Sequence, residues 1–241
     1  MAKVQEGVYF IQGQDEFIPD SHVYIIGEPS SKDLSMVDVG LAGKGAYKVR
    51  AIEKLGIALS SIKRIIMTHT HFDHIGCLPE IKREIPDVEI WVHKKEAELL
   101  AKGDDRAVYG MNEFKNMCEM QYGVEKDAFT LTVDHTPEDG EILEIGNMVW
   151  EVLHIPGHSM GGIALYNPVS KILIPGDVVY ADYAIGRFDL FGANARELKE
   201  SLLRLAELDV DILLPGHNQI VKGLPATYIK ETAKMWAPYL A

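Results

Sequence analysis

Residues 67–76 read M-T-H-T-H-F-D-H-I-G and follow directly on the apolar run Arg64-Ile65-Ile66. The β-branched residues of this run predict a strand, and the polar cluster stands where that strand ends. Side chains alternate in extended chain, so His69 and His71 point the same way, while Asp73 and His74 fall where the next helix begins. Four side chains can therefore meet in one small volume. Imidazoles and a carboxylate suit zinc, iron or manganese, and a divalent charge would offset the desolvation of the gathered acids.

Three further polar side chains follow apolar runs by way of a proline–glycine turn. The turns are Ile155-Pro156-Gly157-His158, Ile174-Pro175-Gly176-Asp177 and Leu214-Pro215-Gly216-His217. A strand followed by such a turn delivers one polar side chain to the rim of a sheet, where a site is rigid yet open to substrate. Asp38, in the stretch Met36-Val37-Asp38-Val39-Gly40, ends an earlier apolar run in the same style. The pattern predicts a metal site at a sheet edge, and these residues alone leave open whether it holds one ion or two.

Apolar runs and helical stretches alternate along the whole chain, with no Pro-rich or Ser/Gly-rich linker between them. Composition and alternation predict strands near residues 8–12, 23–27, 36–39, 64–68, 89–93, 150–154, 163–166, 172–175 and 211–214. Helical periodicity predicts helices at residues 46–55, from 74 to about 84, and at 95–101, 195–208 and 226–236. This order indicates an α/β protein with a layered, mixed architecture, and we expect a single domain over residues 1–241.

Composition narrows the class of protein. The chain has 241 residues, of which 47% are apolar, so it can bury a sizeable core. Its apolar runs are far shorter than the roughly 18 residues that span a bilayer, and its first residues lack the apolar region of a signal peptide. The two cysteines have no C-x-x-C spacing, which suits a reducing compartment, so we expect a cytoplasmic protein with no membrane partner. A net charge of -12 disfavours nucleic acid as a partner.

Residues 103–129 depart from the regular order, because large apolar side chains are scattered among charges. These side chains are Tyr109, Met111, Phe114, Met117, Met120, Tyr122 and Phe129. An amphipathic helix pair packed on the core is one interpretation. Methionine-rich surfaces also adapt well to ligands and partners. The alternative is therefore a helical insertion that caps the site or forms a homodimer contact.

The chain resembles the metallo-β-lactamase superfamily in the motif His69-x-His71-x-Asp73-His74, followed in order by His158, Asp177 and His217, with Asp38 ahead of them. Within that superfamily it is most similar to the glyoxalase II (hydroxyacylglutathione hydrolase) type. The stretches that carry this likeness are Thr68-His69 to Gly76, Pro156-Gly157-His158-Ser159 and Gly186-Arg187-x-Asp189-Leu190. The resemblance extends from about Asp38 to His217. It implies an αββα sandwich, in which helices cover the outer faces of two mixed sheets and the site lies at one edge.

The resemblance also implies a dinuclear centre with two divalent ions per chain, zinc being expected and iron or manganese the alternatives. One ion is implied at His69, His71 and His158, and a second at Asp73, His74 and His217, with Asp177 bridging them. Asp38 is implied to orient the ligand loop by hydrogen bonds, as metal-bound imidazoles generally require.

The implied chemistry is hydrolysis. Two ions about 3.5–4 Å apart share a hydroxide and make it a nucleophile at neutral pH, and Asp73 is implied to steer it or accept its proton. We expect a hydrolase of a thioester or a related acyl ester. A lactonase, an iron-dependent oxygenase of the persulfide dioxygenase kind and a phosphodiesterase or nuclease are the alternatives. Glyoxalase II enzymes hold glutathione through a basic C-terminal helical extension, whereas about 24 residues follow His217 here. We therefore expect a different small-molecule acyl substrate.

Three residues near the predicted site have two interpretations each. Tyr180 follows Asp177 by three residues, which is similar to the spacing in acyl-homoserine lactonases, where a tyrosine hydroxyl supports the substrate carbonyl; a packed aromatic is the alternative. Arg187 is expected either to anchor an anionic end of the substrate or to pair with Asp189. Cys77 is expected to be a small buried residue, the alternative being a thiol that acts on the site from a distance.

Overall fold

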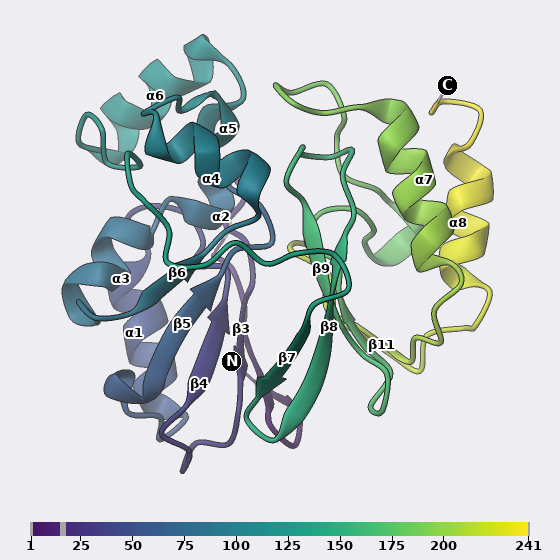
Figure 1. Cartoon of the computed structure of the whole chain (residues 1–241), viewed down its shortest axis with the longest axis horizontal. Coiled ribbons are helices and arrows are strands. Elements are labelled where there is room, and N and C mark those ends of the chain that lie inside the picture. Colours follow the sequence, from purple (N-terminus) through teal and green to yellow (C-terminus); the bar gives the residue numbers. More distant parts are fainter. Residues whose placement is uncertain (1, 15–17, 241) are drawn as a thin grey trace.

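Two sheets packed face to face form the centre of the molecule, and helices cover both outer faces (Figure 1). The computed structural model describes residues 2–14 and 18–240. The first sheet contains β1 (Ala2–Gln5), β2 (Val8–Ile11), β3 (Val23–Ile26), β4 (Leu34–Val37), β5 (Ile62–Ile66) and β6 (Glu89–Trp91). The second contains β7 (Ile142–Ile145), β8 (Met148–His154), β9 (Ile163–Asn167), β10 (Ile172–Ile174), β11 (Ile212–Leu213) and β12 (Val221–Lys222).

Both sheets are mixed. Their strand orders are β1-β2-β3-β4-β5-β6 and β12-β11-β10-β9-β8-β7. The pairs β4–β5, β5–β6 and β10–β11 are parallel and the other neighbours are antiparallel. The predicted αββα sandwich of two mixed sheets is therefore confirmed.

The helices form the two outer layers. They are α1 (Gly45–Lys54), α2 (Phe72–Ile75), α3 (Leu78–Glu84), α4 (Lys94–Ala101), α5 (Arg106–Tyr109), α6 (Asn112–Tyr122), α7 (Ala195–Leu205) and α8 (Tyr228–Trp236), with short 3₁₀ turns at Leu59–Ser61 and Ala181–Tyr183. Helices α1 to α6 lie on the side of the first sheet, and α7 and α8 cover the second (Figure 1).

The alternation of side chains along each strand explains the layers. In β3, Val23 and Ile25 pack toward the helices of the first half, while Tyr24 and Ile26 pack into the core between the sheets. In the second sheet, Leu173 of β10 faces α7 and α8, and its neighbours on the strand face the first sheet. A strand buried on both faces needs apolar residues at every position, which is why these strands read as unbroken apolar runs.

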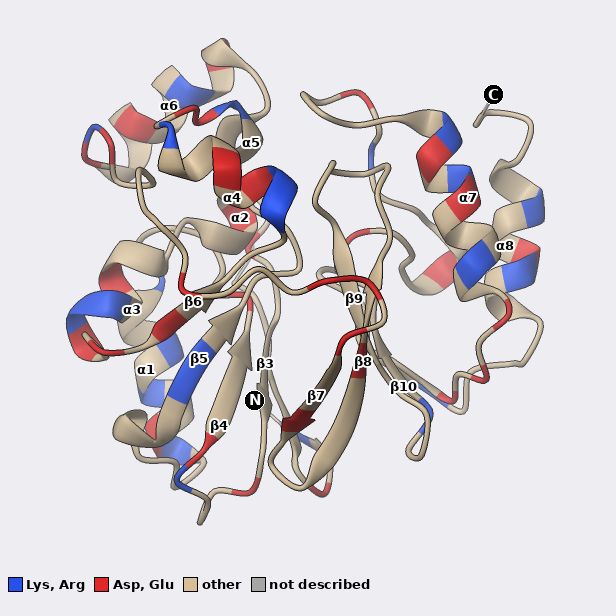
Figure 2. Cartoon of the chain, in the orientation of Figure 1, with Lys and Arg blue, Asp and Glu red and all other residues tan. Residues whose placement is uncertain are grey.

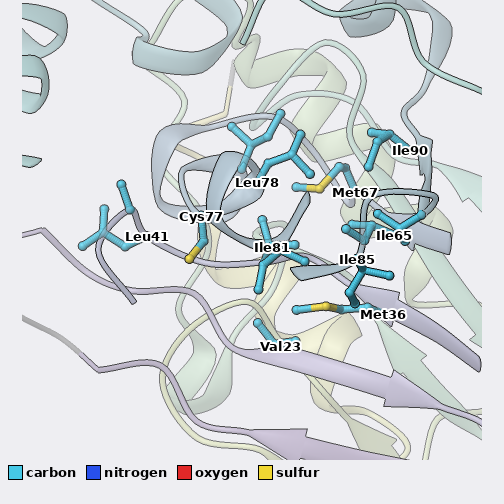
Figure 3. Packing of buried hydrophobic residues seen from close by; sticks show 14 of the residues in the cluster. Val23, Met36, Leu41, Ile65, Met67, Cys77, Leu78, Ile81, Ile85 and Ile90 are labelled. Carbon is cyan, nitrogen blue, oxygen red and sulfur yellow. The ribbon is translucent and has the colours of Figure 1, made fainter. Parts of the chain in front are cut away.

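The core beneath α1 and α3 includes Cys77, which packs among Leu41, Leu78 and Ile81 (Figure 3). Burial raises the pKa of its thiol well above the usual range. The interpretation of Cys77 as a small buried residue is therefore supported, since a protonated thiol without exposure is inert.

The single helix predicted from residue 74 to about 84 is wrong in one respect, because α2 and α3 are separate helices. The Cys77 N–H donates to Gly40 O at 2.8 Å, so the hydrogen-bond ladder is interrupted between them. A side chain at Gly76 would lie 2.4 Å from Phe72 O and 2.8 Å from Ala42 N, so this position has room only for glycine. Strands β1, β7 and β12 were not predicted, and α7 ends at Leu205, three residues before its predicted end.

Charges of both signs are interleaved over the helices (Figure 2). Lysines and arginines stand beside acids on α3, α7 and α8, whose sequences are LPEIKRE, ARELKESLLRL and YIKETAKMW. None of the helices described here is long and apolar enough to cross a membrane.

Candidate metal centre

The loop after β5 carries four of the predicted ligand side chains. Thr68 anchors this loop: its backbone N–H and its hydroxyl both donate to the carboxylate of Asp38 at 2.7 Å. Thr68 O in turn accepts the N–H of Ile163 at 2.8 Å, which links the loop to the second sheet. His71 precedes α2, and that helix holds Asp73 and His74 in its only turn. The loop is therefore fixed at both ends before any ligand binds.

The three proline–glycine turns follow β8, β10 and β11 and bring His158, Asp177 and His217 to the same edge. Gly216 is required because a Cβ there would lie 2.1 Å from Asp177 Oδ1. Gly157 has φ of +128° and a Cβ there would lie 2.1 Å from Leu198 N. Glycine is thus needed for close packing against a ligand carboxylate and against α7, as well as for the turns themselves.

All seven predicted ligand side chains meet at this edge in two clusters. They are His69, His71 and His158 in one, and Asp73, His74, Asp177 and His217 in the other, and within each cluster the ligand atoms lie within 4.8 Å of one another. In the first, His158 Nε2 lies 2.9 Å from His71 Nδ1 and 3.2 Å from His69 Nε2.

Asp177 lies between the two clusters. Its Oδ1 is 3.3 Å from His74 Nε2, and its Oδ2 is 3.4 Å from His217 Nε2 and 3.7 Å from His158 Nε2. The carboxylate thus contacts imidazoles of both clusters. This is the position that a bridging ligand needs.

Hydrogen bonds outside the clusters set which ring nitrogen faces inward. His158 Nδ1 donates to Arg187 O at 2.7 Å, and His74 Nδ1 is bonded to Asp38 Oδ2 at 2.8 Å. When Nδ1 of each ring carries the proton, Nε2 keeps its lone pair and points into its cluster. Asp38 is buried, and its positive φ of 57° is one that aspartate tolerates better than most residues. The predicted orienting position of Asp38 agrees with this geometry.

The two clusters differ in charge. Burial, reinforced by His158, lowers the pKa of His71 to about 3, so this imidazole is neutral at pH 7. Burial would lower the pKa of His217 as well, but Asp177 and Asp73 outweigh it and raise that pKa to about 10. Burial likewise opposes ionisation of Asp73, but its hydrogen bond with His217 lowers its pKa to about 2. The first cluster is therefore a set of neutral nitrogen donors, and the second holds an ion pair.

These residues fit divalent metal ions. Nε2 of His74 and Oδ1 of Asp177 are buried and face each other at 3.3 Å, and neither forms a hydrogen bond of good geometry within the described part of the chain. A native structure rarely leaves such atoms unsatisfied unless they have a function. Imidazole nitrogens and carboxylate oxygens are ligands for zinc, iron and manganese.

Tyr180 and Arg187 both lie beside a pocket of about 310 Å³ that opens on the clusters. The Tyr180 ring centroid is 6.3 Å from that of His217, and burial together with Asp177 raises the pKa of its phenol well above the usual value. Arg187 donates two hydrogen bonds to Asp189, at 2.7 and 2.8 Å. The predicted ion pair of Arg187 is therefore present.

Sequence reasoning missed two buried charged residues near the site. Lys48 of α1 pairs with Asp20 at 2.8 Å, and neither side chain has any solvent exposure. Glu96 of α4 is buried, and its Oε1 accepts the N–H of Gly161 at 3.2 Å, close to the turn that carries His158. Both look like ordinary solvent-facing helix charges in the sequence, and no local signal distinguishes them because their partners are distant along the chain.

A family model described as "Metallo-beta-lactamase superfamily" matches residues 19–217. Among curated relatives, the chain is 36% identical to "Probable metallo-hydrolase YqgX" of Bacillus subtilis, over 66% of each chain. It is 29% identical to "Hydroxyacylglutathione hydrolase GloC" of Haemophilus influenzae, over 78% of this chain and 81% of that one. It is 34% identical to human "Acyl-coenzyme A thioesterase MBLAC2" over 63% of this chain, and the match spans about half of that relative's length, 54%.

Solved structures show the same fold. The B3 metallo-beta-lactamase BLEG-1 superposes with a TM-score of 0.70 at 23% identity, over 97% of this chain and 100% of that one. TTHA1623, solved in a di-iron-bound form, superposes with a TM-score of 0.64 at 26% identity, over 84% of this chain and 89% of that one.

Proposed function

Because the chain belongs to the metallo-beta-lactamase superfamily, we propose that it is a hydrolase that holds two divalent metal ions and opens a thioester or a related acyl ester. The observation that carries the proposal is the position of Asp177 between a cluster of three imidazoles and a cluster of two imidazoles with a second carboxylate. The names of two relatives, a hydroxyacylglutathione hydrolase and an acyl-coenzyme A thioesterase, support an acyl substrate.

His69, His71 and His158 would hold one ion, and Asp73, His74 and His217 the other, with Asp177 shared between them. Bound ions supply a hydroxide at neutral pH and stabilise the negative charge that develops on the substrate oxygen. Zinc is the proposed metal, with iron and manganese as alternatives that the same donors accept.

The side chains of the chain have separate tasks in this proposal. Asp73 is ionised at neutral pH in the metal-free chain, where its hydrogen bond with His217 lowers its pKa to about 2. In the loaded enzyme its carboxylate would hold an ion, and it would orient the attacking water and accept a proton from it. Tyr180 stays protonated at neutral pH, and its hydroxyl can donate a hydrogen bond to the substrate carbonyl from the side of the pocket. Asp38 and Arg187 O keep two imidazoles in the tautomer that presents Nε2.

The test combines metal content with a substrate panel. Freshly purified protein is assayed for zinc, iron and manganese, and for turnover of a thioester, a lactone and a phosphodiester with and without oxygen. Two ions per chain and oxygen-independent thioester hydrolysis support the proposal. One iron per chain with oxygen consumption would instead support the oxygenase alternative.

Two variants connect turnover to the site. His74→Ala and Asp177→Ala should each lower turnover by more than the roughly 100-fold that follows loss of a ligand's hydrogen-bond partner, with circular dichroism unchanged. His135→Ala is the matched control, because its imidazole bonds to Glu141 on the surface, away from both clusters. Unchanged turnover in either site variant would show that the two clusters do not catalyse the reaction.

A further inference from the structure

An apolar wall stands over the polar floor of the pocket beside the two clusters. The floor consists of predicted ligand side chains, among them His71, Asp73 and His217. Much of the wall comes from α5 and the start of α6, which contribute Val108, Tyr109, Met111 and Phe114. Leu190, which lies beside Gly110 at the end of α5, also lines it. The pocket thus divides into a part that suits a reacting carbonyl and a part that suits hydrocarbon.

From this division we infer that the segment formed by α5 and α6 is the acyl-binding wall of the enzyme, which selects substrates with an uncharged alkyl acyl group of short to medium length. The inference rests on the proposed function and names the substrate class of the same site. The 310 Å³ of the pocket, part of which lies over the ligand side chains, gives room for at most roughly ten non-hydrogen atoms at the share of about 30 Å³ that a water molecule takes in the liquid. The lining away from the ligands is apolar, so it suits the alkyl chain of the acyl group better than a bulky polar leaving group, which would extend to solvent.

The apolar wall disfavours an acyl group that ends in a carboxylate. Among the residues described, Arg187 is the one lysine or arginine that lines the pocket, and Asp189 already takes two of its hydrogen bonds. A carboxylate at the far end of the acyl chain would lie against the apolar wall, away from the ions at the floor, and would lose its hydration there without a partner to replace it.

The wall is preformed by contacts that do not involve substrate. The Tyr109 ring stacks on Phe72 of α2 with centroids 5.3 Å apart. The loop after Arg187 is linked to α5 because Phe191 N–H donates to Gly110 O at 3.3 Å and the Arg106 guanidinium lies 4.4 Å from the Phe191 ring centroid. A preformed apolar pocket binds hydrocarbon without first paying the entropy of ordering its walls.

Met111 lines the pocket with a large apolar side chain that protein contacts cover only in part. It is the N-cap of α6, yet its side chain forms no capping hydrogen bond and is 43% exposed. Serine, threonine, aspartate and asparagine are the favoured residues at an N-cap, and large apolar residues are not. The helix start therefore gains nothing from Met111, whereas contact with an alkyl chain would bury the exposed part of its side chain.

The test is a series of thioesters of one thiol, from acetyl to octanoyl, with the metal-loaded protein. Burial of each methylene against the wall is expected to raise kcat/KM roughly three- to fourfold, the equivalent of about 0.8 kcal/mol, until the pocket is full. A succinyl thioester, which ends in a carboxylate, is expected to react more slowly than the butyryl thioester of equal chain length.

Met111→Asn is the diagnostic variant, because asparagine is a good N-cap and adds no charge to the site. About half of the Met111 side chain is available for contact, so its loss should lower kcat/KM for the octanoyl thioester about fivefold, while the acetyl thioester changes less than about twofold. Met120→Asn is the matched control: Met120 is 85% exposed on the same helix and does not line the pocket. Saturation-transfer NMR with 2-octanone gives a second readout without turnover, and Met111→Asn should weaken its signal.

The two hypotheses fail in different ways. If no thioester of the series is hydrolysed, the proposed function is wrong. If the acetyl thioester is hydrolysed but kcat/KM does not rise with chain length, or Met111→Asn behaves like Met120→Asn, the acyl-binding wall is refuted and the hydrolase stands.

Discussion

The buried ion pair between Lys48 and Asp20 makes a quantitative prediction for Lys48→Met. The Lys48 ammonium donates to both carboxylate oxygens of Asp20, at 3.0 and 2.8 Å, and to Ser21 O at 3.1 Å. The Asp20 carboxylate also accepts the N–H groups of Leu41 at 2.8 Å and Gln14 at 2.7 Å. Both side chains have zero exposure. Methionine fills a similar volume without the charge, so the variant isolates the loss of the cation.

The expected magnitude follows from what remains around Asp20. Removing one partner of a buried pair costs about 3–5 kcal/mol, because the other charge stays buried without compensation. Two backbone N–H donors still bind the carboxylate, which places the expected loss near the lower limit, at about 3 kcal/mol. With a urea dependence of about 3 kcal/mol per molar, the midpoint of unfolding should fall by about 1 M.

The assay is urea unfolding followed by circular dichroism, in the presence of a chelator so that metal release does not contribute. Lys3→Met is the matched control, because Lys3 pairs with Glu6 at 2.6 Å while the two side chains are 47% and 79% exposed. Screened surface pairs contribute little, so this variant should leave the midpoint unchanged within error. The double variant Lys48→Met/Asp20→Asn should recover most of the loss, since it also removes the buried negative charge that Lys48 neutralises. A midpoint for Lys48→Met equal to that of Lys3→Met, or a double variant no more stable than the single one, would refute the reasoning.

Three further predictions concern the metal centre. Asp38→Asn should weaken metal affinity about 10- to 100-fold, because the carboxylate that orients His74 is lost; a chelator competition assay measures it, and an unchanged dissociation constant contradicts the role of Asp38. Zinc binding to metal-free protein at pH 7 should release protons, because His217 has a pKa of about 10, is therefore protonated at pH 7 and must lose that proton to bind. Calorimetry in buffers of different ionisation enthalpy counts the released protons. A binding enthalpy that does not depend on the buffer would contradict the ion pair of His217 with Asp73. Gly186→Ala should lower kcat/KM by up to about 100-fold with the fold retained, because its Cβ would lie 1.9 Å from Asp177 O and 2.7 Å from His158 Nδ1 and would displace these two ligand residues. Wild-type turnover would show that the loop moves without disturbing them.

The sequence by itself contained the fold class and the candidate ligands, because both depend on local patterns. Strands that are buried on two faces must be apolar throughout, so runs such as residues 163–166 and 172–175 were recognisable without their partners. The turns before His158, Asp177 and His217 were equally recognisable, since proline and glycine mark strand ends through their own backbone preferences. The break between α2 and α3 was not, because it depends on Gly40 O, a partner far back in the chain.

Only the tertiary structure decided which charges are buried and what surrounds the site. Lys48 and Glu96 lie in helices whose sequences are amphipathic in the ordinary way, and their partners are 28 and 65 residues distant. The inward-facing nitrogen of His158 depends on Arg187 O, 29 residues away, and the apolar wall over the ligands depends on how α5 packs against α2. Periodicity and turn chemistry act within a few residues of the chain. Hydrogen-bond satisfaction, desolvation and pocket shape depend on which distant segments of the chain meet. These three properties could therefore be known only from the tertiary structure.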